Sequence, residues 1–500
     1  MDKPALRRWL TGILVGGLAL TACTGPAPTP STSTSQTSAP ARPFTVVTSQ
    51  KVSTTDPAGI TTDAGTIVAL NVYQRLMLVH PATGALKPDA ATDCLFNSPT
   101  VYECTLPKDL TFSNGHALTS SDVKFSLLRA LRLDGTATSA GLLGSLSRID
   151  TPAPDVVRFK LQWADSQFGY ALAAPAASIV DEEAYDSDSL APVEQVPAGS
   201  GPYRLDLLDV DGLTFSLRED YIGPNRGSIK VIRLAYVADS PAAEEAIATN
   251  QAEVVWRTLD DPALARLRAE IDAGETGTTT HGFKPWGLPG VRVHRLVWNP
   301  DSALRRNSTL RRGIALALQP DRTLDSVIPL KVDGHLKSFP TGGKPKIPNV
   351  SARRVTLTLG YLSTSPGHAD LARQLRDRLE DALGISVHVV ANRTNVDLTL
   401  SDRPAWVNTA FGWLQEYLTA PLPGSAAKLV ALEQRARTAS TPEARLEAVG
   451  EIQKQAAADA TVIPVAQNDV VMYVGSKVSL FGETFGPGWQ LGLWGLQWQN

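Results

Sequence analysis

Apolar and polar positions alternate between helix-like and strand-like spacings along most of the chain. After residues 119–122, Val123, Leu127 and Leu131 recur every four residues, which places them on one face of a helix. Thr119 and Asp122 stand at the spacing of a capping box, in which each residue binds the backbone of the other. This pattern predicts an amphipathic helix that begins after Thr119.

A first strand, helix and strand unit is predicted between residues 229 and 256. Residues 229–237 are rich in β-branched and apolar side chains, and residues 254–256 resume that pattern. Between them, Ser240 and Pro241 are expected as the N-cap and the first residue of a helix, and Asn250 is placed to end it.

A second unit of the same kind follows about 120 residues later. Residues 355–361 and 385–390 read as strands around a helix that ends at Gly384, and a last helix is predicted for 441–457. Two separate units predict two α/β lobes rather than one sheet, and a cleft between lobes is a favoured place for a ligand.

The N-terminus has the pattern of an export signal. Lys3, Arg7 and Arg8 precede the apolar run 9–20, which is shorter than the roughly 20 residues of a membrane-spanning helix. Thr21 and Ala22 lead into Cys23, and residues 20–23 resemble a bacterial lipobox. We therefore expect residues 1–22 to be a lipoprotein signal peptide and Cys23 to carry the lipid; a plain signal peptide beside an incidental cysteine is the alternative.

Residues 24–41 contain no charged side chain and none larger than glutamine. Such a segment cannot bury enough apolar surface to offset the entropy of ordering. We expect residues 23–41 to be a disordered Pro/Ser/Thr tether that holds the rest of the chain away from a membrane.

The remaining two cysteines, Cys94 and Cys104, flank a turn at residues 97–99 between apolar runs. A hairpin would bring them face to face, and an exported chain meets an oxidising compartment. This indicates a disulfide; a metal site is the weaker alternative, because no Cys or His stands at ligand spacing around them.

Composition and motifs exclude several classes of function. The 47 basic and 50 acidic side chains give a net charge of −3, which does not fit a nucleic-acid-binding surface. The chain lacks the common motifs of hydrolases, metalloproteases, dinucleotide-binding enzymes and P-loop proteins, and its seven histidines are scattered. We expect no enzyme activity, no metal and no cofactor.

Several segments together resemble the family 5 extracytoplasmic solute-binding proteins, the oligopeptide- and dipeptide-binding lipoproteins of ABC importers. Residues 102–126 are similar to the family's strand, Phe-Ser-Asn-Gly turn and Leu-Thr-x-x-Asp-Val helix start. The other similar segments are 71–76, 199–203, 297–299, 310–318 and 446–465.

This resemblance implies an α/β, two-lobed periplasmic-binding-protein fold of type II, the large peptide-binding class. It also implies an inserted subdomain and a hinge of two crossing strands, expected near residues 291–299 and 462–472. The division expected is lobe I at 42–72, 197–292 and 467–500, the inserted subdomain at 73–196, and lobe II at 293–466.

The resemblance also points to candidate ligand-binding residues. Peptide-binding relatives pair an aspartate with the peptide's α-amino group, but their Trp-x-Ala-Asp-Tyr motif is absent here. Asp402 stands near that place, and a solvated turn aspartate is the alternative. Broad, stiff tryptophans suit a cleft wall, although the pattern favours a core position for each of them as the alternative. The candidates are Asp402, Trp298, Trp406, Trp413, Asn299 and Tyr73.

The function that follows is a lipid-anchored, monomeric receptor on the outer side of the cell membrane. It would capture a peptide or similar small solute between its lobes and deliver it to the permease subunits of an ABC importer. One alternative is an envelope sensor or scaffold that kept the fold without transport, and a third is an extracellular hydrolase with Asp402 as its local candidate.

Overall fold

The computed structural model describes residues 42–80, 83–133, 138–339, 354–480 and 490–499, and residues 43–500 group into one unit. The predicted signal peptide, Cys23 and the tether lie outside the described residues. No helix in the described part of the chain is both long and apolar enough to cross a membrane.

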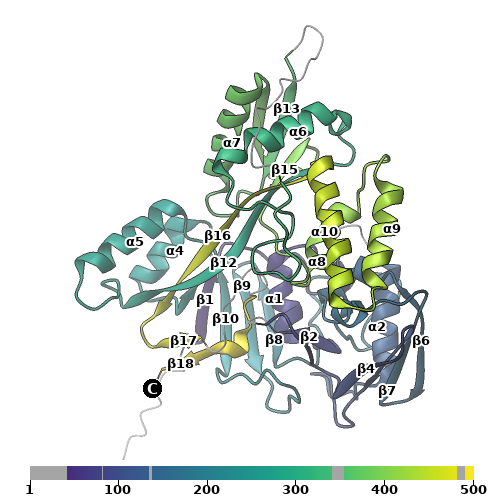
Figure 1. Cartoon of the computed structure of the whole chain (residues 1–500). Helices are drawn as coiled ribbons and strands as arrows, with labels where there is room; N and C mark the ends of the chain where they lie inside the picture. Colours follow the sequence, from purple (N-terminus) through teal and green to yellow (C-terminus); the bar gives the residue numbers. More distant parts are fainter. Residues whose placement is uncertain (1–41, 81–82, 134–137, 340–353, 481–489, 500) are drawn as a thin grey trace, which may run out of the picture. The chain divides into compact units, whose positions relative to one another are not determined.

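A ten-stranded sheet runs through this unit in the order β14, β13, β15, β12, β16, β11, β1, β10, β9, β8 (Figure 1). Its strands are β1 (Phe44–Thr48), β8 (Tyr203–Asp209), β9 (Gly212–Leu217), β10 (Val231–Tyr236), β11 (Val254–Val255), β12 (Phe283–Trp298), β13 (Thr356–Tyr361), β14 (Ser386–Ala391), β15 (Leu398–Ser401) and β16 (Val462–Gly475).

We use lobe I for strands β1 and β8 to β11 with three helices, α1 (Asp63–Val72), α4 (Ser240–Ala248) and α5 (Asp261–Ala273). Strands β10 and β11 both pair in parallel with β1, which confirms the first predicted unit and inserts β1 between its strands. The predicted N-cap is wrong by one residue. Asp239 has extended backbone and accepts the amide hydrogen of Ala242, while the Ser240 hydroxyl donates to Asp260.

We use lobe II for strands β13 to β15 with the helices α6 (Ser308–Ala317), α7 (His368–Leu383), α8 (Ala410–Leu418), α9 (Ala426–Arg437) and α10 (Pro442–Asp459). Strands β13 and β14 pair in parallel around α7, which ends at Gly384 with a φ of 62°. The second predicted unit and the last predicted helix, capped by Thr441, are therefore confirmed.

The two expected lobes are present, but the expectation that they do not share one sheet is wrong. β12 and β16 are long antiparallel partners; β12 also pairs with β15 of lobe II, and β16 pairs with β11 of lobe I. Figure 1 shows the two strands running side by side between the lobes. Because β12 bonds to lobe II, β16 bonds to lobe I and the two strands pair with each other, the hydrogen-bonded ladder continues through the predicted crossings.

A separate four-stranded sheet and α2 (Ser120–Arg132) form the subdomain. The capping box of Thr119 and Asp122 is present, and Val123 and Leu127 are buried as the spacing predicted. At the boundary with lobe I, Arg129 makes a buried, two-bond ion pair with Asp56. The sheet's strands are β4 (Asp93–Ser98), β5 (Val101–Thr105), β6 (Leu146–Ala153) and β7 (Val156–Leu161).

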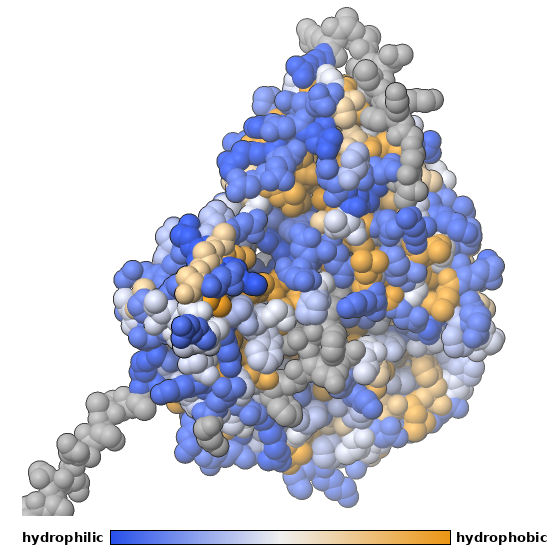
Figure 2. All heavy atoms as spheres, turned by 60° about the vertical axis from the view of Figure 1, so that its left-hand side comes forward, coloured by the Kyte–Doolittle hydropathy of each residue, from blue (hydrophilic) through white to orange (hydrophobic). Residues whose placement is uncertain are grey.

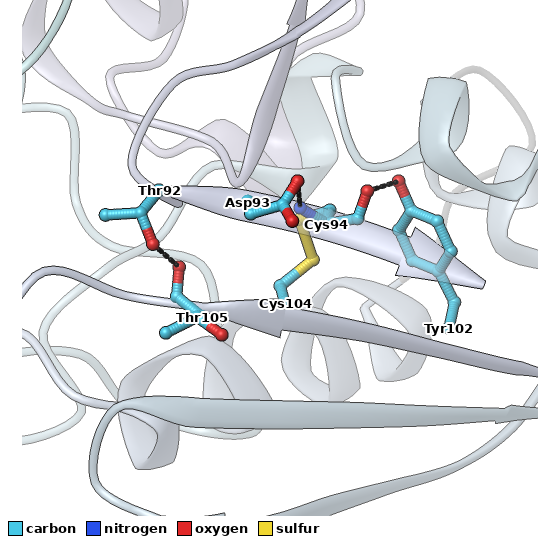
Figure 3. Close-up of a disulfide and its surroundings, with 6 residues drawn as sticks. All are labelled: Thr92, Asp93, Cys94, Tyr102, Cys104 and Thr105. Atoms are coloured by element: carbon cyan, nitrogen blue, oxygen red, sulfur yellow. Dashed lines mark hydrogen bonds between the residues drawn. A yellow bond between two sulfur atoms is a disulfide. The ribbon is translucent and has the colours of Figure 1, made fainter. Parts of the chain in front are cut away.

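The predicted disulfide joins β4 to β5. Cys94 and Cys104 are direct partners in the antiparallel register, with Cα atoms 4.1 Å apart. Figure 3 shows the bond between two further contacts, the Thr92 hydroxyl donating to Thr105 and the Tyr102 hydroxyl donating to the Cys94 carbonyl. The hairpin geometry expected from the turn is confirmed.

The structure also contains smaller helices and strands. They include α3 (Phe168–Ala171) and the strand pairs β2 (Met77–Val79) with β3 (Leu86–Pro88) and β17 (Val478–Leu480) with β18 (Leu496–Trp498). In Figure 2, which brings the α4 and α5 side forward, hydrophilic residues cover most of the described surface and apolar residues form scattered groups.

Candidate ligand-binding site

Asp402 lies where lobe I, lobe II and the crossing strands meet. It follows β15, and its Oδ2 accepts hydrogen bonds from Arg292 Nε at 2.8 Å and Arg257 Nη2 at 3.2 Å. Its Oδ1 accepts a bond from the Ser365 hydroxyl at 3.2 Å. Arg292 belongs to β12, and Arg257 follows β11. A single carboxylate therefore joins the two lobes and the hinge.

The charge network extends one residue further into lobe I. Arg257 also forms an ion pair with Asp63 at the start of α1, so that it lies between two carboxylates. The network then contains two acidic and two basic side chains, and the most exposed of the four, Arg292 and Asp63, are each only 17% exposed. Pairing of this kind is what allows charges to stay buried.

The pKa values of Asp402 and Asp63 are shifted in opposite directions because the surroundings of the two carboxyl groups differ. Burial alone would raise the pKa of Asp402, but Arg292 and Arg257 outweigh it and hold that pKa below its usual range. Burial dominates at Asp63 and raises its pKa, since this carboxyl has Arg257 alone as its charged partner and also feels the charge of Asp402.

Two buried histidines lie beside Asp402. The rings of His294 and His368 are 5.4 Å apart, and His368 Nε2 is 3.6 Å from Asp402 Oδ2. Burial and the charge of Arg292 lower the pKa of His294 to about 3. Burial likewise lowers the pKa of His368 to about 4, because the attraction of Asp402 does not compensate for it. Both rings are therefore neutral at neutral pH.

A cavity of 310 Å³ adjoins this network. It lies between the start of α5, the start of α7 and the crossing strands, and its lining includes Arg257, Arg292 and His294. Figure 2 shows the surface hollowed between the α4 and α5 region and the lobe II helices above it. The volume is at the lower end of the range for small-molecule sites.

A smaller cavity of 70 Å³ lies on the subdomain side, lined by Trp406 together with Arg75, Asn408 and others. Trp406 is 7% exposed, and it packs with Val407 into the hydrophobic core of the subdomain although both belong to lobe II. The guanidinium of Arg403 lies 4.9 Å from the centre of the Trp406 ring. Trp406 is thus a contact between lobe II and the subdomain.

The other candidate residues do not line these cavities; three of them are buried in the cores, and Asn299 is half-buried. Trp298 and Trp413 are 2% and 1% exposed in the core of lobe II, and Trp413 donates to Asn408. Tyr73 is buried in lobe I, where its hydroxyl bonds Thr55 and Tyr185. Asn299 donates to the Val396 carbonyl. Ligand contact by these four side chains stays a prediction.

Sequence reasoning missed the partners of Asp402. Arg257, Arg292, His294 and His368 lie 34 to 145 residues from Asp402 in the sequence, so no local motif links them. One signal was present. Arg292 and His294 are two residues apart on β12, which puts both on one face of the predicted crossing.

No group of three or more His, Cys, Asp or Glu side chains within the described ranges is arranged to hold a metal ion.

Comparison with known proteins defines the class. A family model described as bacterial extracellular solute-binding proteins, family 5 Middle, matches residues 85–345, and the chain belongs to this family. Its members are solute-binding proteins of ABC importers and not enzymes, as predicted.

A curated relative is the HTH-type transcriptional regulator SgrR of Pectobacterium atrosepticum. It is 26% identical over 244 residues, which are 48% of this chain and 41% of that protein. The chain therefore matches less than half the length of this relative.

Solved structures share the two-lobed fold. The periplasmic binding protein DppA of Helicobacter pylori, in complex with the peptide STSA, is 16% identical with a TM-score of 0.76, covering 91% of this chain and 98% of that chain. AgaA of A. tumefaciens R10, with agropinic acid, is 18% identical with a TM-score of 0.76, covering 92% and 99%. NikA of Staphylococcus aureus, with Ni(L-His)2, is 15% identical with a TM-score of 0.73, covering 91% and 99%.

Proposed function

We propose that the chain is a lipid-anchored receptor outside the cell membrane that captures a peptide or similar small solute and delivers it to an ABC importer. The family supports the binding role and the link to import. The residue division given above, a monomeric state and permease subunits as partners belong to the same proposal.

The observation that carries the proposal is the position of Asp402. Its two arginine partners come from lobe I and the hinge, and both line the 310 Å³ cavity. A solute in that cavity would contact groups whose positions depend on how the lobes are closed. It would therefore favour the closed state by its differential affinity for the two arrangements. We assign ligand contact to this cavity and to the Trp406 side.

Calorimetric titration of the purified full-length chain in detergent with a library of short peptides tests the binding step. Saturable heat with one or more peptides is the expected result. Binding to a sugar or a metal chelate, with no heat from any peptide, would remove peptides from the proposal.

The anchor needs a separate test. A Cys23→Ser variant is expected to leave the membrane fraction and enter the soluble extracytoplasmic fraction, whereas a Thr21→Ser variant should remain membrane-bound. Retention of the Cys23→Ser variant on membranes would contradict lipid attachment at this position.

The match to SgrR, a transcriptional regulator, favours an envelope sensor as a second candidate. Uptake of a labelled ligand by cells with and without this gene separates the two roles. Equal uptake with intact ligand binding would support the sensor.

A further inference from the structure

The floor of the 310 Å³ cavity contains polar groups that the protein itself does not satisfy. His294 is 3% exposed, and its Nδ1 has no hydrogen-bond partner among the described residues. The Nη2 of Arg292 is also buried and lacks a partner there, although Nε of the same guanidinium binds Asp402. Both residues line the cavity. Buried polar atoms of this kind are uncommon and call for a partner.

The start of α7 adds a second feature that favours a negatively charged group in this cavity. This 16-residue helix begins after Gly367, whose φ of 72° is left-handed and which provides no side-chain cap. Pro366 and Gly367 line the cavity. The first backbone N–H groups of a helix and its dipole favour negative charge, so this end of the helix favours an anion in the same cavity as the Arg292 guanidinium and the neutral His294 ring.

The rim of the cavity has the opposite charge. Asp261, Asp370 and Asp469 line it and are exposed. Asp370 pairs with Arg373, and Asp469 accepts the Gly290 amide hydrogen at 2.7 Å. Hydrogen-bond donors of a solute would find acceptors at this level, while a second negative charge on the solute would be repelled.

Asp402 is placed poorly for the role that the aspartate of peptide-binding relatives performs. It is 8% exposed and already binds Arg257, Arg292 and Ser365. An incoming ammonium group would have to displace an arginine from it. The unpartnered polar atoms at this end of the cavity therefore belong to Arg292 and His294 and not to a carboxylate.

We propose that this cavity recognises a small solute through its carboxylate, which binds Arg292 Nη2, His294 and the start of α7, with the solute's hydrogen-bond donors at the acidic rim. Recognition then begins with the acid group of the solute instead of an α-amino group. This inference rests on the proposed function, because it names the chemical class that the receptor captures.

Paired ligands test the inference on the unaltered protein. Alanyl-alanine, its C-terminal amide and its N-acetyl form are titrated calorimetrically into the full-length chain, together with lactate, lactamide and glycerol 3-phosphate. We expect each free acid to bind roughly 100-fold more tightly than its amide, because amidation leaves a buried cationic donor unpaired. Acetylation of the amine should have a smaller effect.

Each other result has a distinct meaning. Equal binding of acid and amide, with loss on acetylation, overturns the inference and leaves the receptor function intact. Tighter binding of glycerol 3-phosphate than of any carboxylate overturns the carboxylate assignment. An absence of heat from every compound overturns the inference. The proposed receptor function is contradicted as well only if the peptide library described above also gives no binding heat.

A variant pair locates the site. Arg292→Gln should reduce the preference for acid over amide, whereas Arg204→Gln, an exposed arginine on β8, should preserve it. An unchanged preference in folded Arg292→Gln protein would place the carboxylate elsewhere and overturn the inference. If this variant does not fold, the acid and amide comparison on the unaltered chain decides.

Discussion

Asp402 of lobe II and Arg257 of lobe I form an ion pair between the lobes, with 3.2 Å between Oδ2 and Nη2. Their side chains are 9% and 8% exposed, so solvent screens this pair much less than a surface pair. Arg292 reinforces it from the hinge at 2.8 Å. The structure thus fixes the two lobes to each other by charge as well as by the crossing strands.

Removal of one member of this pair should be costly. Asp402→Asn leaves two buried arginines without their shared carboxylate, and we expect the free energy of unfolding to fall by about 3 to 5 kcal/mol. Urea titration followed by tryptophan fluorescence measures it. The Arg257→Gln and double variants complete a cycle, in which the double variant should be less destabilised than the sum of the single ones.

The exposed pair of Arg148 and Asp150 provides the matched control, since Asp150→Asn should leave the free energy of unfolding nearly unchanged. Equal effects of Asp402→Asn and Asp150→Asn would show that the network between the lobes does not stabilise the fold.

The buried histidines predict an acid-sensitive fold. The pKa of His294 is lowered to about 3 and that of His368 to about 4, while an unfolded histidine titrates near 6.5. The unfolded state therefore binds more protons below pH 6.5, and stability should fall as the pH drops from there toward 4. The slope is at most about 1.4 kcal/mol per pH unit for each histidine.

The two carboxylates of the network affect the pH dependence of stability in opposite directions. The lowered pKa of Asp402 gives stability that is present above the ordinary value of 3.8 and is lost below it, whereas the raised pKa of Asp63 acts the other way. The contribution of the histidines between pH 4.5 and 6.5 is therefore measured as the difference in slope between the unaltered protein and a histidine variant, since both proteins keep the same carboxylates. A His294→Gln/His368→Gln variant should flatten the pH slope, and His281→Gln, at an exposed position, should not. Identical slopes in all three proteins would contradict the assignment.

Local patterns predicted the local structure well. The helix after Thr119, the two strand, helix and strand units and the hairpin of Cys94 and Cys104 depend on neighbours in the sequence, and all are present. The continuous sheet was missed, because strand length and pairing across the β12 and β16 crossing are decided by tertiary contacts. The site was missed for the same reason. Asp402 was selected by resemblance, while the arginines that lower its pKa lie far from it in the sequence.

The disulfide should contribute modestly to stability. Cys94 and Cys104 are 10 residues apart, and closing so short a loop restricts the unfolded chain by about 2 to 3 kcal/mol in the chain-entropy model. A Cys94→Ser/Cys104→Ser variant should therefore melt at a lower temperature than the oxidised protein. A reducing agent should destabilise the unaltered chain and have no effect on the variant. A reductant effect of equal size on both proteins would assign the loss to another cause.

Gly199 should tolerate no side chain, because the chain passes against the end of α1 at this point. A methyl group on Gly199 would lie 2.0 Å from the Val72 carbonyl oxygen, and the Gly199 carbonyl itself accepts the Ser113 amide hydrogen at 2.9 Å. The backbone must therefore move, and contacts of lobe I with the subdomain would be lost. We expect Gly199→Ala to lower the free energy of unfolding by about 1 to 3 kcal/mol.

The control for Gly199 is Gly424, where an added methyl group meets nothing within 4 Å. Gly424→Ala should be neutral or slightly stabilising, since it restricts the unfolded chain without a clash. Denaturant titration of both variants compares them directly. A Gly199→Ala protein as stable as Gly424→Ala would mean that the end of α1 can shift freely, and that the glycines of segment 199–203 are not required by close packing against the backbone.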